Sequence, residues 1–151
     1  MTTTTQDKLG AYTAHQRGQE DSRETDARAL LSCASRLKAA IDAGPGDMAS
    51  YAEAIRFNQR LWTIFQVALC DPDNQLPGTL KTTLLNLSRY VDRVSFRAIT
   101  EFSPPLLTGL IDINRMIASG LNVKQRPAET ALVQPAAEHL PHAPAAVMTS
   151  A

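Results

Sequence analysis

The side chains that most often perform catalysis stand in unfavourable places along this chain. All three histidines, His15, His139 and His142, lie in polar or Ala/Pro-rich stretches that show no helical pattern. Acid–base catalysis and metal binding need groups that a packed scaffold holds within hydrogen-bond reach. His139 and His142 are close enough in sequence to grip a metal ion loosely, but a solvated tail is the favoured interpretation. We therefore expect no catalytic or metal site and predict that the protein is not an enzyme.

Two further motifs with chemical potential are also weak. Residues 44–49 (GPGDMA) formally match the glycine pattern of dinucleotide-binding proteins. That pattern needs a preceding strand within a βαβ unit, whereas here a helical stretch comes before it. Cys33 and Cys70 lie in helical patterns, and two thiols without a secretion signal indicate reduced and buried side chains. No cofactor is expected.

The composition is that of an ordinary soluble domain. The chain has 151 residues, enough for one domain, with 44% hydrophobic and 20% charged residues. Only 5% are aromatic, so a core must be built from Leu, Ile, Val and Ala, which suits packed helices better than a β-sandwich. The formal net charge is zero, which counts mildly against a dedicated nucleic-acid binder.

Nothing in the sequence indicates export or membrane insertion. The N-terminal residues contain no apolar segment typical of a signal peptide. The longest apolar stretch, residues 61–70, is interrupted by Thr63 and Gln66 and is too short to cross a bilayer. We therefore expect no membrane span and a cytoplasmic location.

Amphipathic periodicity predicts an all-α fold, a small bundle of four main helices. The first should run from about Ser22 to Ala43, where apolar residues recur at spacings of three and four. Asp21 and Glu24 resemble a capping box at its start. Gly44 offers a left-handed stop after it, and Pro45 prevents continuation.

The other three helices follow in close succession. The second should span about Met48–Cys70, with Ser50 and Glu53 as one possible capping box and Asp47 as an alternative cap. The third should begin near Pro77 and continue for roughly 25 residues. The fourth should be capped by Ser103 and stop at Gly120, and it is apolar nearly all round, so it is either deeply buried or docked to a partner.

The two ends of the chain differ from this pattern. Residues 1–21 are polar and Thr-rich and are expected to be disordered, with Tyr12 as a possible anchor for a partner. Residues 122–151 are rich in Ala and Pro and are expected to form a disordered tail. The folded domain is therefore predicted to comprise residues 22–121.

One tryptophan and a few polar residues stand out on the apolar stripes. Trp62 lies on the stripe of the second helix, and a core position is favoured over contact with a partner. Asn58 interrupts the same stripe, and a buried amide must find a hydrogen-bond partner that fixes helix register. Asp112 and Asn114 point to different sides of the fourth helix, so at most one of them is the partner of Asn58. Direct recognition of another protein by Asn58 is the less favoured alternative.

A basic stripe lies on the third helix. Arg89, Arg93 and Arg97 recur every four residues and so share one face. Such a stripe can bind an acidic partner or RNA phosphates. Because Asp92 and Glu101 are nearby and no aromatic side chain is expected on that face, a solvated face is favoured.

Five short segments stand out by their order along the chain: residues 58–65 (NQRLWTIF), 71–77 (DPDNQLP), 87–93 (LSRYVDR), 110–115 (LIDINR) and 120–121 (GL). This series resembles the FlaF family of flagellar biosynthesis proteins. The segments include the elements Asn-x-x-Leu-Trp, Leu-Pro and Ile-Asp-Ile-Asn, and together they are more specific than any one alone. The resemblance covers roughly residues 12–121, with Tyr12 similar to a tyrosine that precedes the family's first helix. The Ala/Pro-rich tail departs from the family's compact pattern.

This resemblance implies a role in flagellin production and export. The implied partner is flagellin, with the protein as secretion chaperone or assembly factor, alongside the regulator FlbT. An amphipathic helix of flagellin would then lie in an apolar groove of the bundle, and the sequence leaves open which helix face forms that groove. Two alternatives stay open: a post-transcriptional regulator that acts with FlbT or on flagellin mRNA, and a structural assembly protein bound to the export machinery. The arginine stripe is the sequence feature that supports the regulator.

Overall fold

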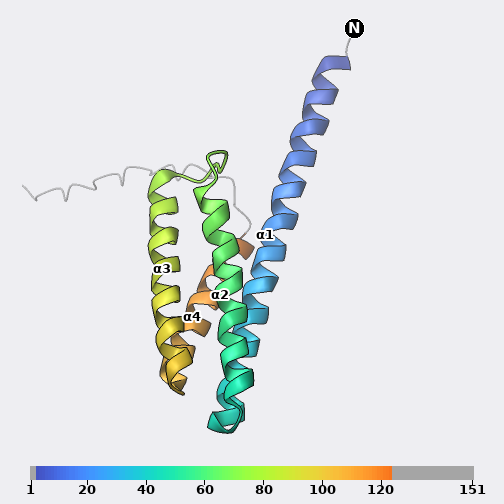
Figure 1. Cartoon of the computed structure of the whole chain (residues 1–151). Coiled ribbons are helices and arrows are strands. Elements are labelled where there is room, and N and C mark those ends of the chain that lie inside the picture. Colours follow the sequence, from blue (N-terminus) through green and yellow to red (C-terminus); the bar gives the residue numbers. More distant parts are fainter. Residues whose placement is uncertain (1–2, 124–151) are drawn as a thin grey trace, which may run out of the picture.

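Four α-helices and one short 3₁₀ turn make up the computed structural model of this protein (Figure 1). It describes the backbone of residues 3–123 and the side chains from Asp7 onward, and no strand occurs in that part of the chain. The predicted all-α fold class with four helices is confirmed. The elements are α1 (Thr3–Ala43), η1 (Gly44–Gly46), α2 (Met48–Cys70), α3 (Gly78–Thr100) and α4 (Pro104–Asn122).

The helices pack as two pairs that share one core. α4 packs along α1, and α3 packs along α2, while α2 also contacts α1 and α3 contacts α4 more sparsely. α1 is much the longest helix and runs on past the ends of the others (Figure 1). All four helices contribute apolar side chains to one continuous cluster, whose largest fully buried members are Leu30, Leu37, Tyr51, Ile55, Trp62, Val91, Leu107 and Leu110.

Three helix ends lie where the sequence predicts them. Gly44 has a φ of 74°, the left-handed conformation that ends α1 at low steric cost. The carboxylate of Asp47 caps α2 by accepting a hydrogen bond from the backbone N–H of Ser50 at 3.0 Å. Hydrogen bonds from Ser50 hold the pKa of the Asp47 carboxyl below its usual value. Pro104 begins α4, where its missing N–H is tolerated.

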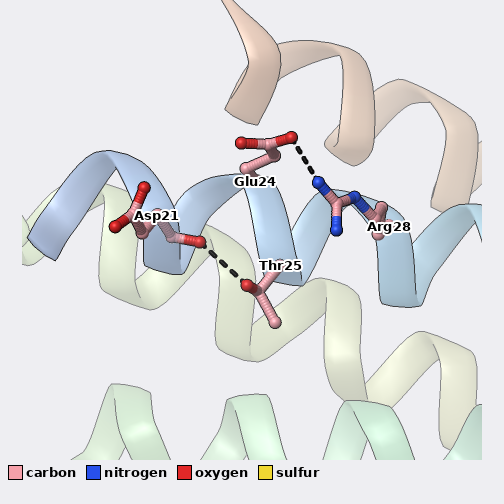
Figure 2. A network of polar contacts seen from close by, with 4 residues as sticks. All are labelled: Asp21, Glu24, Thr25 and Arg28. Carbon is pink, nitrogen blue, oxygen red and sulfur yellow. Dashed lines mark hydrogen bonds and ion pairs between the residues drawn. The ribbon is translucent and has the colours of Figure 1, made fainter. Parts of the chain in front are cut away.

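The start of α1 differs from the prediction. The helix begins at Thr3 rather than near Ser22, so residues 3–21 are helical where disorder was expected. Asp21 and Glu24 therefore lie inside α1 and do not cap it (Figure 2). The carbonyl of Asp21 accepts a hydrogen bond from Thr25 Oγ1 at 2.8 Å, and Glu24 forms an ion pair with Arg28.

The physical reason is that nothing interrupts the helix once its packed part has formed. No proline occurs between Thr3 and Ala43, and each added residue gains a backbone hydrogen bond without a new nucleation cost. Gly10 and Gly18 weaken the segment by about 1 kcal/mol each without breaking it. Residues 7–22 are exposed throughout, so this part projects as a helix without tertiary contacts. We refer to residues 3–22 of α1 as the arm.

At the other end, α4 continues past Gly120 to Asn122, and the N–H of Val123 closes the last turn on the carbonyl of Ser119 at 3.2 Å. The predicted disordered tail, residues 122–151, therefore starts too early, because Asn122 is part of α4. The remainder of that prediction concerns residues 124–151, which lie outside the described residues. None of the helices in residues 3–123 is long and apolar enough to span a membrane.

Candidate partner-binding site

A chain of buried hydrogen bonds joins α2 to α4. The indole Nε1 of Trp62 donates to Asn114 Oδ1 at 2.9 Å, and Asn114 Nδ2 donates to Asn58 Oδ1 at 2.7 Å. Asn58, Trp62 and Asn114 are at most 1% exposed. Of the two partners considered for Asn58, the structure therefore brings Asn114 to it, while Asp112 lies exposed on the outside of α4.

This polar centre fixes how α2 and α4 are aligned. A shift of either helix by one residue would separate the two amides and leave them unsatisfied in the core. Trp62 also packs edge-on against Phe65, with ring centroids 5.8 Å apart. With 1% of its surface exposed, Trp62 cannot contact a partner while the bundle is folded. Its place is in the core.

One hydrogen-bond donor of the Asn58–Asn114 pair has no acceptor, so replacing the two asparagines should lower the stability by different amounts. Asn58 Nδ2 is buried without a hydrogen-bond partner among the described residues. Asn114→Leu would leave both Trp62 Nε1 and Asn58 unpaired and should cost about 2–6 kcal/mol. Asn58→Leu removes the unpaired amide and leaves only Asn114 Nδ2 without its acceptor, so it should cost about 1–3 kcal/mol. Urea denaturation followed by circular dichroism compares the two, and equal losses would contradict this account.

A second polar contact, which the sequence did not reveal, joins the start of α2 to the turn between α3 and α4. The hydroxyl of Tyr51 donates to the carbonyl of Glu101 at 3.2 Å and accepts from the N–H of Ser103 at 3.1 Å. Its ring packs on Phe102 at 5.1 Å between centroids. Tyr51 thereby holds the turn between α3 and α4 against α2. Its position on the buried stripe of α2 was visible in the sequence, but the partners of its hydroxyl were not.

Reactive groups in the described part of the chain are dispersed. Burial raises the pKa of the Cys33 thiol to about 11, despite the nearby Arg36, so Cys33 stays protonated at neutral pH. Burial also raises the pKa of Asp26 above its usual value. His15 lies on the exposed arm beside Gln19. No cluster of three or more His, Cys, Asp or Glu side chains suited to a metal ion occurs among the residues that the structure describes.

The core-facing stripe of α1 continues along the arm. From Leu30, positions spaced by three or four residues lead through Ala27 and Arg23 up to Tyr12 and Leu9. Inside the bundle the members of this stripe are buried, with Leu30 at 0% and Ala27 at 1% exposed. Tyr12 and Leu9 are 61% and 59% exposed, because no other helix reaches that far (Figure 1). The arm thus exposes Leu9 and Tyr12 on the same face of α1 that the other helices cover farther along the chain, at Ala27 and Leu30.

One side of α2 is also left open. Phe57, Leu61, Ile64 and Ala68 share this side at helical spacing. Phe57 lies under the guanidinium of Arg36 from α1, 4.0 Å from the ring centroid, so this side faces α1. Farther up, α1 and α2 diverge (Figure 1), and Ile64 is 63% exposed. These exposed apolar residues lie in two separate places, Leu9 and Tyr12 on the arm and Ile64 and Ala68 on α2, and we refer to the two places together as the uncovered apolar surface.

Comparison of the sequence with models of known protein families identifies the family of this chain. The family model described as flagellar protein FlaF matches residues 8–121. The chain belongs to the FlaF family. Searches of curated proteins and of solved structures give no match. Because the FlaF match begins at residue 8, it includes Leu9 and Tyr12 on the arm as well as all of α2, α3 and α4 up to Leu121.

The predicted site residues of this FlaF-family chain thus fall into four separate places. Asn58, Trp62 and Asn114 form the polar centre of the core. Tyr12 lies on the arm, and Asp112 is exposed on α4 away from both. The arginine stripe lies exposed on the outside of α3, and its members are Arg89, Arg93 and Arg97.

Proposed function

We propose that this FlaF-family protein is a non-catalytic flagellin-binding protein, a secretion chaperone or assembly factor, that captures an amphipathic helix of flagellin. Membership of a flagellar protein family supports a flagellar partner. The observation that carries the proposal is the uncovered apolar surface, above all the exposed pair Leu9 and Tyr12 on the arm. When a helix projects beyond its bundle with its core-facing stripe exposed, a partner helix can pack against that stripe as the other helices of the bundle do elsewhere.

The dimensions suit a helix of ordinary length. Phe57 of α2 lies opposite Arg36 of α1, and the two helices run antiparallel, so Ile64 stands at about the level of residue 29. From that level up to Leu9, α1 rises about 30 Å, the length of a helix of roughly 20 residues. A partner helix of that length would reach both ends of the uncovered apolar surface. It would contact both ends of this surface through apolar side chains at spacings of three and four residues.

Burial of the exposed side chains supplies the affinity. Covering a Leu or Tyr side chain contributes about 1.5–3 kcal/mol. The arm also gains from being covered, since an isolated helix of this length with two glycines is only marginally stable in water. Binding therefore requires no reaction and no cofactor, only apolar contact that can be released at export. Covering the helix of flagellin would in turn keep its apolar stripe from self-association.

The proposal is tested with the variant Leu9→Ala/Tyr12→Ala. Truncating both side chains should raise the Kd for purified flagellin by about thirtyfold, which corresponds to roughly 2 kcal/mol of lost apolar contact. The melting temperature should stay within a few degrees of the wild type, because both side chains are mostly exposed. Isothermal titration calorimetry with flagellin measures the first effect and circular dichroism the second.

The matched control is Leu80→Ala/Tyr90→Ala. Leu80 and Tyr90 are exposed by 42% and 46%, but they lie on α3, away from the arm. This control should bind flagellin as the wild type does. If both double variants lose the same affinity, or if wild-type protein does not bind flagellin, the proposed function is wrong.

A further inference from the structure

The outer face of α3 combines positive charge with exposed aromatic rings. At 100° per residue, Tyr90 and Phe96 lie about 60° to either side of Arg93, so both flank the arginine stripe. Phe96 is 73% exposed and Tyr90 46%. The expectation that no aromatic side chain lies on this face is wrong, because α3 is covered by α2 on one side only and contacts α4 sparsely. We call the five residues Arg89, Tyr90, Arg93, Phe96 and Arg97 the α3 basic face.

The charge on this face is not neutralised within the described part of the chain. The ion pairs among described residues are Arg28–Glu24 and Lys38–Asp42, both on α1. α3 carries a single acidic residue, Asp92, and its carboxylate is turned toward α2, where it accepts a hydrogen bond from Gln66 Nε2 at 2.9 Å. Glu101 follows the end of α3, but none of the three arginines forms an ion pair with it or with Asp92 among the described residues.

We propose that the α3 basic face is a second docking surface, and that it binds an acidic helical segment of a partner protein. Arginines at every fourth residue stand about 6 Å apart along the helix axis. Carboxylates at every fourth residue of a second helix have the same spacing. Each carboxylate can form a bidentate pair with a guanidinium, in which it accepts two hydrogen bonds. Phe96 lies beside these pairs as an apolar anchor. Arginine and aromatic residues are the types enriched in the cores of protein interfaces.

The observations favour a protein over a nucleic acid as the occupant. The arginines span only about 12 Å of a convex helix surface, whereas proteins that bind single strands enclose them in a positively charged groove. Lysine is absent from the face, and the chain as a whole has no excess positive charge to attract a polyanion. The recognition of carboxylates at helical spacing needs neither a groove nor a long-range field.

The α3 basic face is separate from the surface proposed to bind flagellin. α3 lies on the far side of α2 from α1 and its arm (Figure 1). Two partners can therefore occupy the two surfaces at the same time. For the same reason the two proposals can fail independently of each other.

The test uses a synthetic helical peptide as probe, with Glu at every fourth position and one Leu per turn. Fluorescence anisotropy of the labelled peptide is followed as the full-length protein is added, at low and high salt. Arg89→Gln, Arg93→Gln and Arg97→Gln together should weaken binding by about tenfold or more and remove most of its salt dependence. Phe96→Ala should weaken binding at both salt concentrations. A peptide with the same composition but scattered Glu positions should bind less well than the probe.

The matched control is Arg56→Gln, Arg60→Gln and Arg115→Gln, which removes the same charge from exposed positions on α2 and α4. It should keep the affinity of the wild type. The inference is overturned if the wild type does not bind the probe, or if the control loses as much affinity as the α3 variant. It is also overturned if a polyuridine RNA binds the same arginines more tightly than the peptide does, a result that would favour a regulator acting on mRNA. Flagellin titrations with the α3 variant should match those of the wild type, so this outcome is independent of the flagellin proposal.

Discussion

Replacing Trp62 by alanine is expected to lower the free energy of unfolding by about 3–5 kcal/mol, a large share of the stability of a small domain. Trp62 is 1% exposed and lies between α2 and α4. The substitution removes the largest side chain of the core and leaves a cavity that the rigid helices can close only in part. It also deprives Asn114 Oδ1 of its donor in a place that water does not reach. Urea denaturation followed by far-ultraviolet circular dichroism gives the value.

Trp62→Phe separates the two contributions. Phenylalanine keeps most of the ring contact with Phe65 but has no N–H for Asn114, so its cost should be clearly smaller than that of alanine. If Trp62→Ala instead unfolds like the wild type but loses flagellin affinity, the side chain must leave the core to contact the partner. That result would contradict the packing described here.

Most of the bundle could be predicted from the sequence because its helix boundaries have local causes. α2 occupies Met48–Cys70, as predicted, because Asp47 caps its start and Asp71-Pro72 follows its end. α3 begins directly after Pro77, and α4 begins with Pro104, whose fixed φ fits the first turn. Ser103 precedes α4 as predicted, but its side chain makes no capping hydrogen bond. Signals of this kind depend on backbone chemistry within a few residues. They hold without knowledge of tertiary contacts.

The arm could not be predicted in this way. Its stripe contains Gln16, Gln19 and Arg23 between Tyr12 and the buried Ala27, so hydrophobic periodicity fades before residue 22. Helicity there depends on propagation from the packed half of α1, which a local pattern does not register. Because the apolar pattern begins only after residue 22, Asp21 and Glu24 seemed to stand at a helix start, although they lie within a continuous helix.

The sequence defined the candidates for the polar centre but not the pairing. Asp112 and Asn114 are two positions apart, about 200° around α4, so one of them had to face outward. Which of them faces Asn58 depends on how α4 is rotated against α1 and α2, a property of the whole core. The expectation that no aromatic side chain lies on the arginine face failed for a similar reason, since the exposure of Phe96 depends on how little of α3 is covered by α4.

A chain shortened to begin at Ser22 is expected to fold and yet to bind flagellin at least about a hundredfold more weakly. Residues 7–22 of the arm are exposed along their length, so their removal takes away no buried contact from the core. Glu24 and Asp26 would then stand in the first turn of the shortened α1, where negative charge is favourable. The thermal transition should therefore stay cooperative and within a few degrees of the full chain.

The loss of affinity follows from what the arm carries. Without it, neither Leu9 nor Tyr12 can be buried by a partner, and the contact of these two side chains alone is worth roughly 2 kcal/mol. The loss should exceed that of Leu9→Ala/Tyr12→Ala, because the backbone and the remaining side chains of the arm are removed as well. Calorimetric titration with flagellin and a thermal melt are made on the same preparation. A shortened chain that melts much earlier would show that the arm packs on the bundle. One that melts normally and still binds flagellin with full affinity would place the binding surface elsewhere, and Ile64 and Ala68 alone would then have to carry it.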